Sequence, residues 1–152
     1  MSSARICLRV SGTPVERLDA FERFADRAAV DLDAWARRLG SVARVLAAVQ
    51  RVRYVPDPPG SADKICDAAT TLREGGDCED LAALVVGGAR ALGVPARLVW
   101  IAQGGPLDHV VAEVYVEGRW QWAEPTIAGA MLGEHPYEAA ARLLAAVPGI
   151  GR

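Results

Sequence analysis

Three residues that lie far apart along the chain could together perform acyl transfer. Cys78 lies in the run Gly-Gly-Asp-Cys-Glu-Asp, and His109 and Glu124 follow it in that order. A thiol nucleophile, an imidazole base and a carboxylate that orients the imidazole are the groups that cysteine-based acyl transfer requires. The sequence therefore predicts a catalytic site made of Cys78, His109 and Glu124.

The thiol is expected at the beginning of a helix, 78–92. Asp77 is the expected N-cap, and Asp80 is placed to complete a capping box. At a helix N-terminus, unpaired backbone N–H groups and the helix dipole favour a thiolate, although a free thiol has a pKa of about 8.5. The backbone N–H of Cys78 is also a natural donor to an oxyanion.

His109 and Glu124 belong to a part of the chain in which apolar residues alternate with a period of two. His109 is expected to begin one strand, and Glu124 to follow its hairpin partner, which starts after Glu117-Gly118. The hairpin would return the carboxylate to the imidazole, where it could fix the ring tautomer. Taken singly, each of these residues also fits a structural role, as a core cysteine, a surface histidine or a strand end.

Asp77, Glu79 and Asp80 place like charges around the sulfur. Carboxylates in such positions tend to raise the pKa of a thiol. Three arrangements of these carboxylates are consistent with the sequence: they cap the helix, pair with Arg73 or Arg97, or hold Ca²⁺ through their oxygens.

The remaining histidine and cysteines are weaker candidates for the catalytic site. His135, in a turn before a predicted helix, is expected to be a surface or capping residue, and it is the alternative base if His109 lies elsewhere. The odd number of three cysteines argues against a disulfide framework and favours a reducing compartment. Cys7 is expected to be buried in a strand, and Cys66 to be a packing residue that could bond to Cys78 on oxidation.

Composition narrows the class of protein. With 152 residues, 51% of them hydrophobic, the chain is expected to form a single domain over 1–152 with a sizeable core. A net charge of -2 and a pI near 5.7 give no bulk attraction to nucleic acid or to anionic lipid. No long apolar stretch and no signal-peptide pattern is found, so we expect a cytoplasmic protein without membrane association.

The first half of the sequence is mainly helical in pattern. A strand is expected at 4–10, and a helix that Thr13 caps and Pro14 begins. A second helix covers about 31–50, and Gly40 could break it.

The second half changes from a helical to a strand period. A proline-rich loop, 55–61, precedes a short predicted helix, 62–72, and then the helix that begins at Cys78. The later expected elements are a strand at 96–102, a turn at 103–106, the hairpin and a last helix at 136–146. Helices followed by an antiparallel meander indicate the α+β class.

Residues 72–126 resemble the transglutaminase-like superfamily, which includes cysteine peptidases, acyltransferases and related bacterial and phage proteins. The resemblance rests on four motifs: Gly76-Asp77-Cys78-Glu79-Asp80, Ala91-Leu92-Gly93-Val94-Pro95-Ala96-Arg97, Asp108-His109-Val110 and Gly118-Arg119-Trp120-Gln121-Trp122-Ala123-Glu124-Pro125-Thr126. It implies a papain-like α+β core over about 54–127, in which the cysteine helix packs on an antiparallel sheet. The strand and helices of 4–50 and the helix 136–146 would flank this core.

The resemblance also implies roles for individual residues. It makes Cys78 the nucleophile, His109 the base and Glu124 the orienting carboxylate, at a position where the family usually has Asp. The family's second oxyanion donor comes from upstream, and Tyr54 is the candidate in this sequence.

The same resemblance bears on cofactors. In some bacterial members the acidic neighbours of the cysteine bind calcium, which makes Asp77 and Glu79 candidate ligands. No other cofactor is required by the predicted chemistry.

Three kinds of function are consistent with the sequence. The first is a thiolate–imidazolium hydrolase that cleaves peptide or amide bonds of a protein or peptide substrate through a Cys78 thioester. Amine acyl transfer, as in transglutaminases, is the alternative activity, because an amine can take the acyl group in place of water. The others are a catalytically silent binding or phage-assembly module and a redox switch through Cys66 and Cys78. The sequence indicates no oligomeric state.

Overall fold

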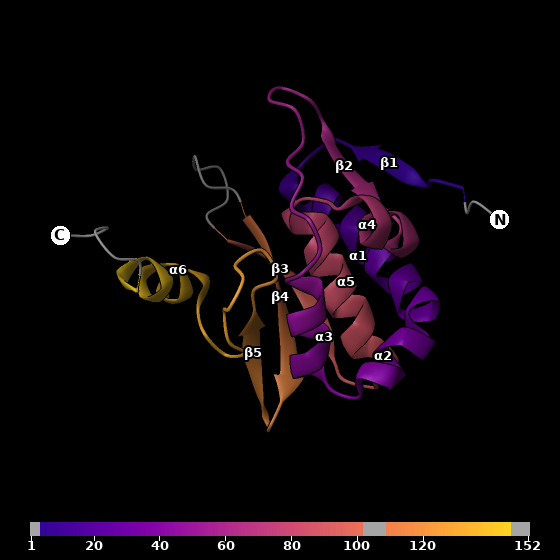
Figure 1. Ribbon diagram of the computed structural model, residues 1–152. Helices are drawn as coiled ribbons and strands as arrows, with labels where there is room; N and C mark the ends of the chain where they lie inside the picture. Colours follow the sequence, from indigo (N-terminus) through magenta and orange to yellow (C-terminus); the bar gives the residue numbers. More distant parts are fainter. Residues whose placement is uncertain (1–3, 102–108, 147–152) are drawn as a thin grey trace.

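A computed structural model describes residues 4–101 and 109–146 of this chain (Figure 1). Its elements, in chain order, are β1 (Cys7–Val10), α1 (Pro14–Asp31), α2 (Asp33–Leu39), α3 (Val42–Val49), β2 (Asp63–Cys66), α4 (Ala68–Glu74), α5 (Cys78–Ala91), β3 (Ala96–Ile101), β4 (His109–Val116), β5 (Arg119–Ala123) and α6 (Pro136–Ala145). Helix α5 lies between the N-terminal helices on one side and the sheet of β3, β4 and β5 on the other. The α+β class and the packing of the cysteine helix on an antiparallel sheet are confirmed.

The beginnings and ends of the N-terminal helices follow local sequence signals. Thr13 caps α1 in a capping box with Glu16, as the Thr-Pro pair predicted. The predicted helix over 31–50 is divided at Gly40, which adopts a left-handed conformation with φ of 84°. Ser41 then caps α3 by accepting a hydrogen bond from Arg44 N–H. The break at Gly40 is thus confirmed.

Helix α5 is buried along most of its length because other elements pack against it from both sides. Two glycines make the close packing possible. A Cβ at Gly87 would lie 2.6 Å from the Cβ of Ala28 in α1, and a Cβ at Gly88 would lie 2.7 Å from Cγ1 of Val45 in α3. These contacts fix α5, and with it Cys78, relative to the helical layer.

The three-stranded sheet has the order β3-β4-β5 and is antiparallel throughout. The turn between β4 and β5 has positive φ values at Glu117 (56°) and Gly118 (76°), which suits the twist of a tight hairpin. The predicted hairpin is therefore confirmed. The predicted turn 103–106 and Asp108 lie outside the described residues.

Helix α6 begins and ends close to the predicted range, with His135 as its N-cap. Among the helices of the described ranges, none combines the length and the apolar character needed to cross a membrane.

The predicted helix over 62–72 is wrong in its first half. Asp63–Cys66 form a strand that pairs antiparallel with β1, and a helix begins only at Ala68, with Asp67 as its N-cap. Strand pairing outweighs the local helical pattern here, because β1 offers a partner that the sequence around residue 63 does not reveal. Within the range 4–10 that was predicted as a strand, the alternating apolar residues Ile6 and Leu8 are more than half exposed, and Val10 is the one that is buried.

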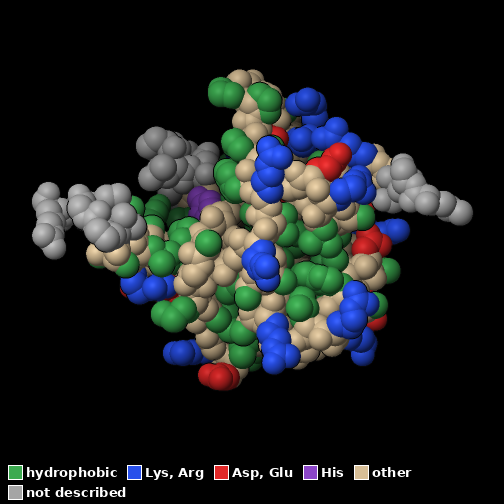
Figure 2. Space-filling model, in the orientation of Figure 1, with side chains coloured by type: hydrophobic (Ala, Val, Ile, Leu, Met, Phe, Trp, Pro, Cys, Tyr) green, Lys and Arg blue, Asp and Glu red, His purple; other side chains and the backbone are tan. Residues whose placement is uncertain are grey.

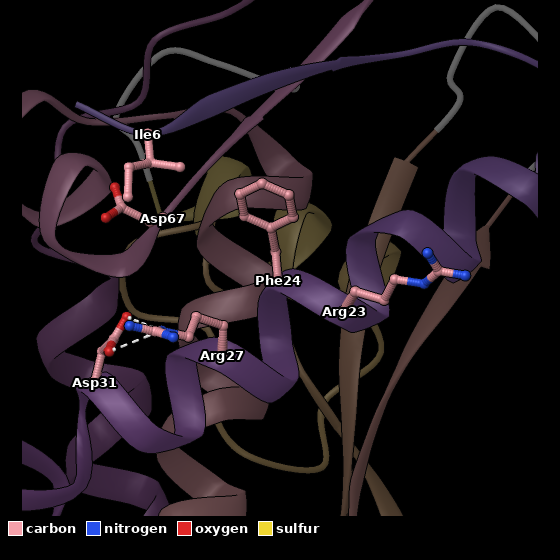
Figure 3. Close-up of a pocket in the computed structure, with 6 residues that line it drawn as sticks. All are labelled: Ile6, Arg23, Phe24, Arg27, Asp31 and Asp67. Atoms are coloured by element: carbon pink, nitrogen blue, oxygen red, sulfur yellow. Dashed lines mark hydrogen bonds and ion pairs between the residues drawn. The ribbon is translucent and has the colours of Figure 1, made fainter. Parts of the chain in front are cut away.

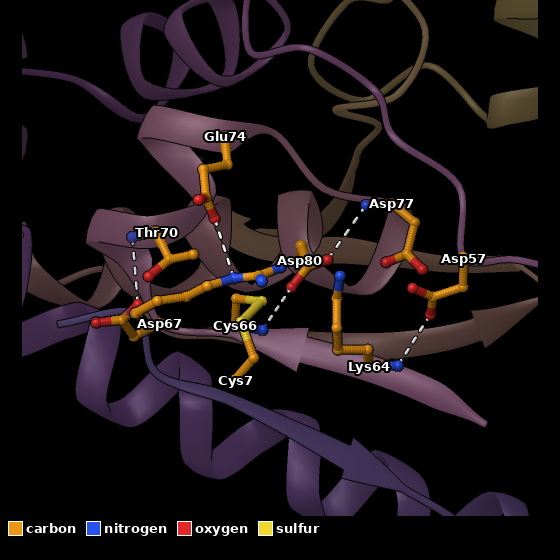
Figure 4. Close-up of a disulfide and its surroundings, with 10 residues drawn as sticks. Cys7, Asp57, Lys64, Cys66, Asp67, Thr70, Glu74, Asp77 and Asp80 are labelled. Atoms are coloured by element: carbon orange, nitrogen blue, oxygen red, sulfur yellow. Dashed lines mark hydrogen bonds and ion pairs between the residues drawn. A yellow bond between two sulfur atoms is a disulfide. The ribbon is translucent and has the colours of Figure 1, made fainter. Parts of the chain in front are cut away.

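The expectation that no disulfide forms is wrong as well. Cys7 and Cys66 lie opposite each other in β1 and β2 and are joined by a disulfide (Figure 4). An odd number of cysteines excludes a fully paired set but not one pair and one free thiol. Because Cys66 is bonded to Cys7, the redox pair predicted between Cys66 and Cys78 is not formed, and the cysteine count no longer supports a reducing compartment. Cys7 is only half-buried.

Candidate active site

Cys78 is the first residue of α5, and its position is fixed by hydrogen bonds of the capping turn. The carboxylate of Asp80 accepts the Asp77 N–H through Oδ2 (3.2 Å) and the Cys66 N–H through Oδ1 (2.8 Å). Asp80 thereby ties the start of α5 to β2, and the predicted capping box is confirmed. Burial raises the pKa of Asp80 to about 6, although hydrogen bonds from Cys66 and Asp77 act in the opposite direction.

The sulfur of Cys78 lies between two polar groups. Its thiol donates a hydrogen bond to Oε2 of Glu79 (3.2 Å), and the backbone N–H of Val110 is close enough to affect its ionisation. Burial, followed by the charge of Glu79, raises the pKa of the thiol above its ordinary value, whereas the Val110 N–H lowers it. The acidic neighbours therefore act as the sequence predicted, and they stabilise the neutral thiol.

His109, at the start of β4, binds Glu124, which directly follows β5. Nε2 of the imidazole lies 2.5 Å from Oε2 of Glu124. The other carboxylate oxygen, Oε1, accepts hydrogen bonds from the backbone N–H (2.8 Å) and the hydroxyl (2.6 Å) of Thr126. Glu124 is fully buried, while the imidazole keeps a quarter of its surface exposed. The predicted approach of carboxylate to imidazole through the hairpin is observed.

This contact decides which ring nitrogen can face a nucleophile. Because Nε2 is bound to Glu124, Nδ1 is the nitrogen left to exchange a proton. The sulfur of Cys78 lies close enough to the backbone of Val110, the residue next to His109 in β4, for the Val110 N–H to lower the pKa of the thiol. The fold thus brings the thiol, the imidazole and the carboxylate to one end of the sheet, beside the N-terminus of α5.

Two supporting residues were not identified from the sequence. Thr126 holds the carboxylate of Glu124, and Gln50, just after α3, donates through Nε2 to the carbonyls of Glu124 (3.0 Å) and Ala130 (2.9 Å). Thr126 follows Glu124 by two residues, a spacing at which side chains often form local hydrogen bonds. This spacing could have predicted the contact from the sequence. Gln50 had no such signal, because its partners are distant along the chain.

Tyr54, the candidate oxyanion donor, lies close to the sulfur. It forms a parallel bridge with Gly76, and the next residue, Val55, donates its N–H to the Gly76 carbonyl (2.8 Å). Partial burial, and then the charges of Cys78 and Asp77, raise the pKa of Tyr54 to about 12. The phenol therefore stays protonated and able to donate, and half of its surface is exposed.

A cluster of carboxylates lies beside the cysteine turn. Oxygens of Asp57, Asp63 and Glu79 all lie within 4.8 Å of one another. Asp77 belongs to the same group, since its side chain faces Asp57 (Figure 4) and Glu79 is close enough to raise its pKa. Burial raises the pKa of Asp77 to about 12 and, together with Glu79, raises that of Asp63.

The family resemblance made Asp77 and Glu79 the candidate calcium ligands. Asp57 comes from the proline-rich loop and Asp63 from β2, which was expected to be a helix, so the cluster forms only in the tertiary structure. The alternative that Arg97 pairs with the acidic run is wrong, because Arg97 binds Glu113 instead (2.8 Å).

His135 takes a structural role. Its Nδ1 accepts the backbone N–H of Tyr137 (3.2 Å) as the N-cap of α6, and its ring contacts Trp122 edge-on. The prediction of a capping histidine is confirmed, and His109 is the histidine next to the cysteine turn.

A separate hollow of about 340 Å³ lies between β1 and α1 (Figure 3). Ile6 and Phe24 line it with the side chains of Arg23 and Arg27, and Asp31 pairs with Arg27 at its rim. None of the predicted site residues lines this hollow.

Comparison with solved structures found a protein of similar fold. A solved structure from Cytophaga hutchinsonii, described as a "putative cysteine protease", has the same fold with a TM-score of 0.52 and 22% sequence identity. The alignment covers 90% of this chain and 55% of the other, so the chain spans about half the length of that protein. No curated protein sequence matches the chain.

The sequence model of the transglutaminase-like superfamily matches residues 29–125, which include Cys78, His109 and Glu124. The match covers more than half of the 152 residues. The chain therefore belongs to the transglutaminase-like superfamily.

Proposed function

We propose that this protein is a cysteine hydrolase that cleaves peptide or amide bonds, with Cys78 as nucleophile, His109 as general base and Glu124 as orienting carboxylate. The observation that carries the proposal is the His109–Glu124 hydrogen bond beside the chain's free thiol. Membership of the superfamily, and a fold shared with the protein described as a "putative cysteine protease", support a cysteine peptidase type of activity.

In the first half of the proposed reaction, Nδ1 of His109 takes the proton of the Cys78 thiol. The sulfur attacks the carbonyl carbon of the substrate, and the oxyanion accepts hydrogen bonds from the Cys78 N–H and the Tyr54 hydroxyl. Glu124 stabilises the imidazolium, which then gives its proton to the departing amine. A thioester at Cys78 remains.

In the second half, His109 activates the group that takes the acyl chain. Water gives hydrolysis and restores the thiol; an amine gives acyl transfer through the same steps. An activity assay with a labelled amine present therefore identifies which group accepts the acyl chain. Incorporation of the amine into the substrate would identify a transferase, and cleavage without incorporation a hydrolase.

We also propose calcium as the ligand of the carboxylate cluster. Oxygens that bind one Ca²⁺ at 2.3–2.6 Å lie up to about 5 Å apart, which matches the spacing of Asp57, Asp63 and Glu79. Asp77 supports the fit, because its Oδ1 is buried without a hydrogen-bond partner among the described residues. A bound cation would supply positive charge beside the sulfur, which favours the thiolate.

Thermal unfolding of protein freed of metal tests the calcium proposal. Calcium should raise the unfolding temperature of the wild type by several degrees, whereas the unfolding temperature of the Asp63→Asn variant should not respond to calcium. Asp19→Asn, an exposed change in α1, is the control and should respond like the wild type. Equal responses of Asp63→Asn and the wild type would contradict the assignment.

The rate of iodoacetamide alkylation across pH, measured with calcium present, tests the catalytic proposal without a substrate. Of the three cysteines, Cys78 is the one outside the disulfide, so the readout is specific. A thiolate paired with imidazolium reacts below the pH at which an ordinary thiol ionises, and His109→Ala should reduce the rate near neutral pH by about tenfold or more. His135→Ala is the matched control, because it removes the other of the two histidines.

The same measurement separates the enzyme from the silent module. If wild type and His109→Ala both show an apparent thiol pKa of about 8.5 or above, the thiol is not activated and the binding or assembly role is favoured. Loss of reactivity in His135→Ala but not in His109→Ala would also contradict the proposed roles.

A further inference from the structure

A concave surface rich in cations lies next to the cysteine turn. One cavity of about 380 Å³ and a neighbouring one of about 290 Å³ share Arg5 and Lys64 in their walls. We call this surface the basic groove and define it by five cations: Arg5, Arg9, Arg53, Lys64 and Arg73. Figure 2 shows Lys and Arg side chains gathered over the part of the molecule where β1, β2 and α4 lie in Figure 1.

The strand register concentrates charge in this groove at a cost in stability. Arg9 of β1 lies directly opposite Lys64 of β2. Like charges directly opposite each other destabilise an antiparallel pair. Within 4–101 and 109–146, neither side chain has a carboxylate partner, and Glu74, which pairs with Arg5, is the acid in the groove wall. An arrangement that lowers stability without local compensation is typical of a binding surface.

The groove lies close to the cysteine turn along the chain. Its wall includes Gly75, three residues before Cys78, and Arg53, whose carbonyl accepts the Gly76 N–H (3.1 Å). Three residues of extended chain span at most about 11 Å. A polypeptide whose scissile bond lies at the sulfur could therefore place side chains in the groove within three or four residues of that bond.

We propose that the basic groove binds an acidic segment of a polypeptide substrate, with Asp or Glu side chains three or four residues from the bond attacked by Cys78. This inference rests on the proposed function and adds the class of substrate. The chain has a net charge of -2, so the attraction arises from the local arrangement of these cations and not from the total charge.

Fluorescence anisotropy with Cys78→Ala protein tests the inference independently of catalysis. The probe is a labelled ten-residue peptide with four Asp or Glu residues, and the comparison peptide carries Asn and Gln instead. The acidic peptide should bind more tightly, and more weakly as salt rises. The double change Arg9→Gln and Lys64→Gln should weaken its binding about tenfold.

Two controls keep the result specific. Arg38→Gln with Arg119→Gln removes the same charge from exposed positions elsewhere and should leave the affinity unchanged. The groove variant should unfold at the same or a higher temperature, because the Arg9–Lys64 repulsion is relieved. If the unfolding temperature is not lowered, a loss of peptide binding in the groove variant cannot be due to unfolding.

Several results would overturn the inference: equal binding of the two peptides, an unchanged affinity in the groove variant, or tighter binding of a ten-nucleotide single strand, which would make the occupant a nucleic acid. If alkylation shows an activated thiol but the acidic peptide does not bind, only the groove inference fails. If the peptide binds as expected but the thiol is not activated, the proposed function fails and the groove remains a binding surface.

Discussion

Removal of the Cys7–Cys66 disulfide is expected to destabilise the protein strongly. The two cysteines are separated by 59 positions, so the bridge closes a long loop that contains the first three helices. In the chain-entropy treatment a loop of this length corresponds to about 4 kcal/mol of stability. For a protein of 152 residues that is a fall of roughly 8–16 °C in unfolding temperature.

The effect should reach the site, because β2 carries Asp63 and its Cys66 N–H binds Asp80 at the start of α5. We therefore expect the Cys7→Ala, Cys66→Ala variant to lose part of its calcium response as well as its stability.

Thermal and urea unfolding, with and without reductant, provide the measurement. The wild type should be destabilised by reductant to about the level of the double variant, and the double variant should not respond to it. A thiol count of one in unreduced, unfolded wild type and of three after reduction would verify the pairing. The reasoning is refuted if the wild type and the double variant unfold at the same temperature in the absence of reductant.

Three further predictions concern packing, the buried carboxylate and pH. Gly87→Ala should destabilise by about 1–3 kcal/mol in urea unfolding, because its Cβ would overlap Ala28; equal or greater stability would contradict the packing. Thr126→Val removes the hydroxyl that donates to buried Glu124 and should cost about 1.5–3 kcal/mol, whereas no loss would mean that the hydroxyl is dispensable. Since burial raises the pKa of Asp80 to about 6 in the folded protein, the unfolded chain binds fewer protons, and Asp80 alone should remove up to about 3 kcal/mol of stability from metal-free protein as pH rises from about 4 to 6. Asp80→Asn should make the fall in stability shallower without abolishing it, because the raised pKa of Asp77 acts in the same direction, and an unchanged slope would contradict the role of Asp80.

Much of the site could be predicted because its pieces are encoded locally. The Asp77 N-cap depends on residues within one helical turn, and Glu117-Gly118 specify a tight hairpin. The hairpin in turn brings Glu124 back beside His109. Each of these features is decided by neighbours a few positions away, which is the range over which helix and strand periods and turn preferences operate.

The choice of partners across the fold could not be predicted in this way. Asp63–Cys66 have a helical local pattern, yet they form a strand because β1 lies alongside. The disulfide depends on the same register, which sets Cys7 opposite Cys66. A one-residue shift in pairing would turn these side chains to opposite faces, and nothing near either cysteine specifies the register.

The sequence by itself therefore determined the helix that begins at Cys78, the hairpin that follows it, and the order of the three residues that we propose as nucleophile, base and carboxylate. Only the tertiary structure decided that Nε2 of His109 is the nitrogen bound to Glu124, that Asp57 and Asp63 join the acidic residues beside the sulfur, and that the cations of β1 and β2 form one groove. The physical reason is that capping, turn geometry and periodicity act over a few residues, whereas these contacts join side chains from distant segments and exist only when the core has packed.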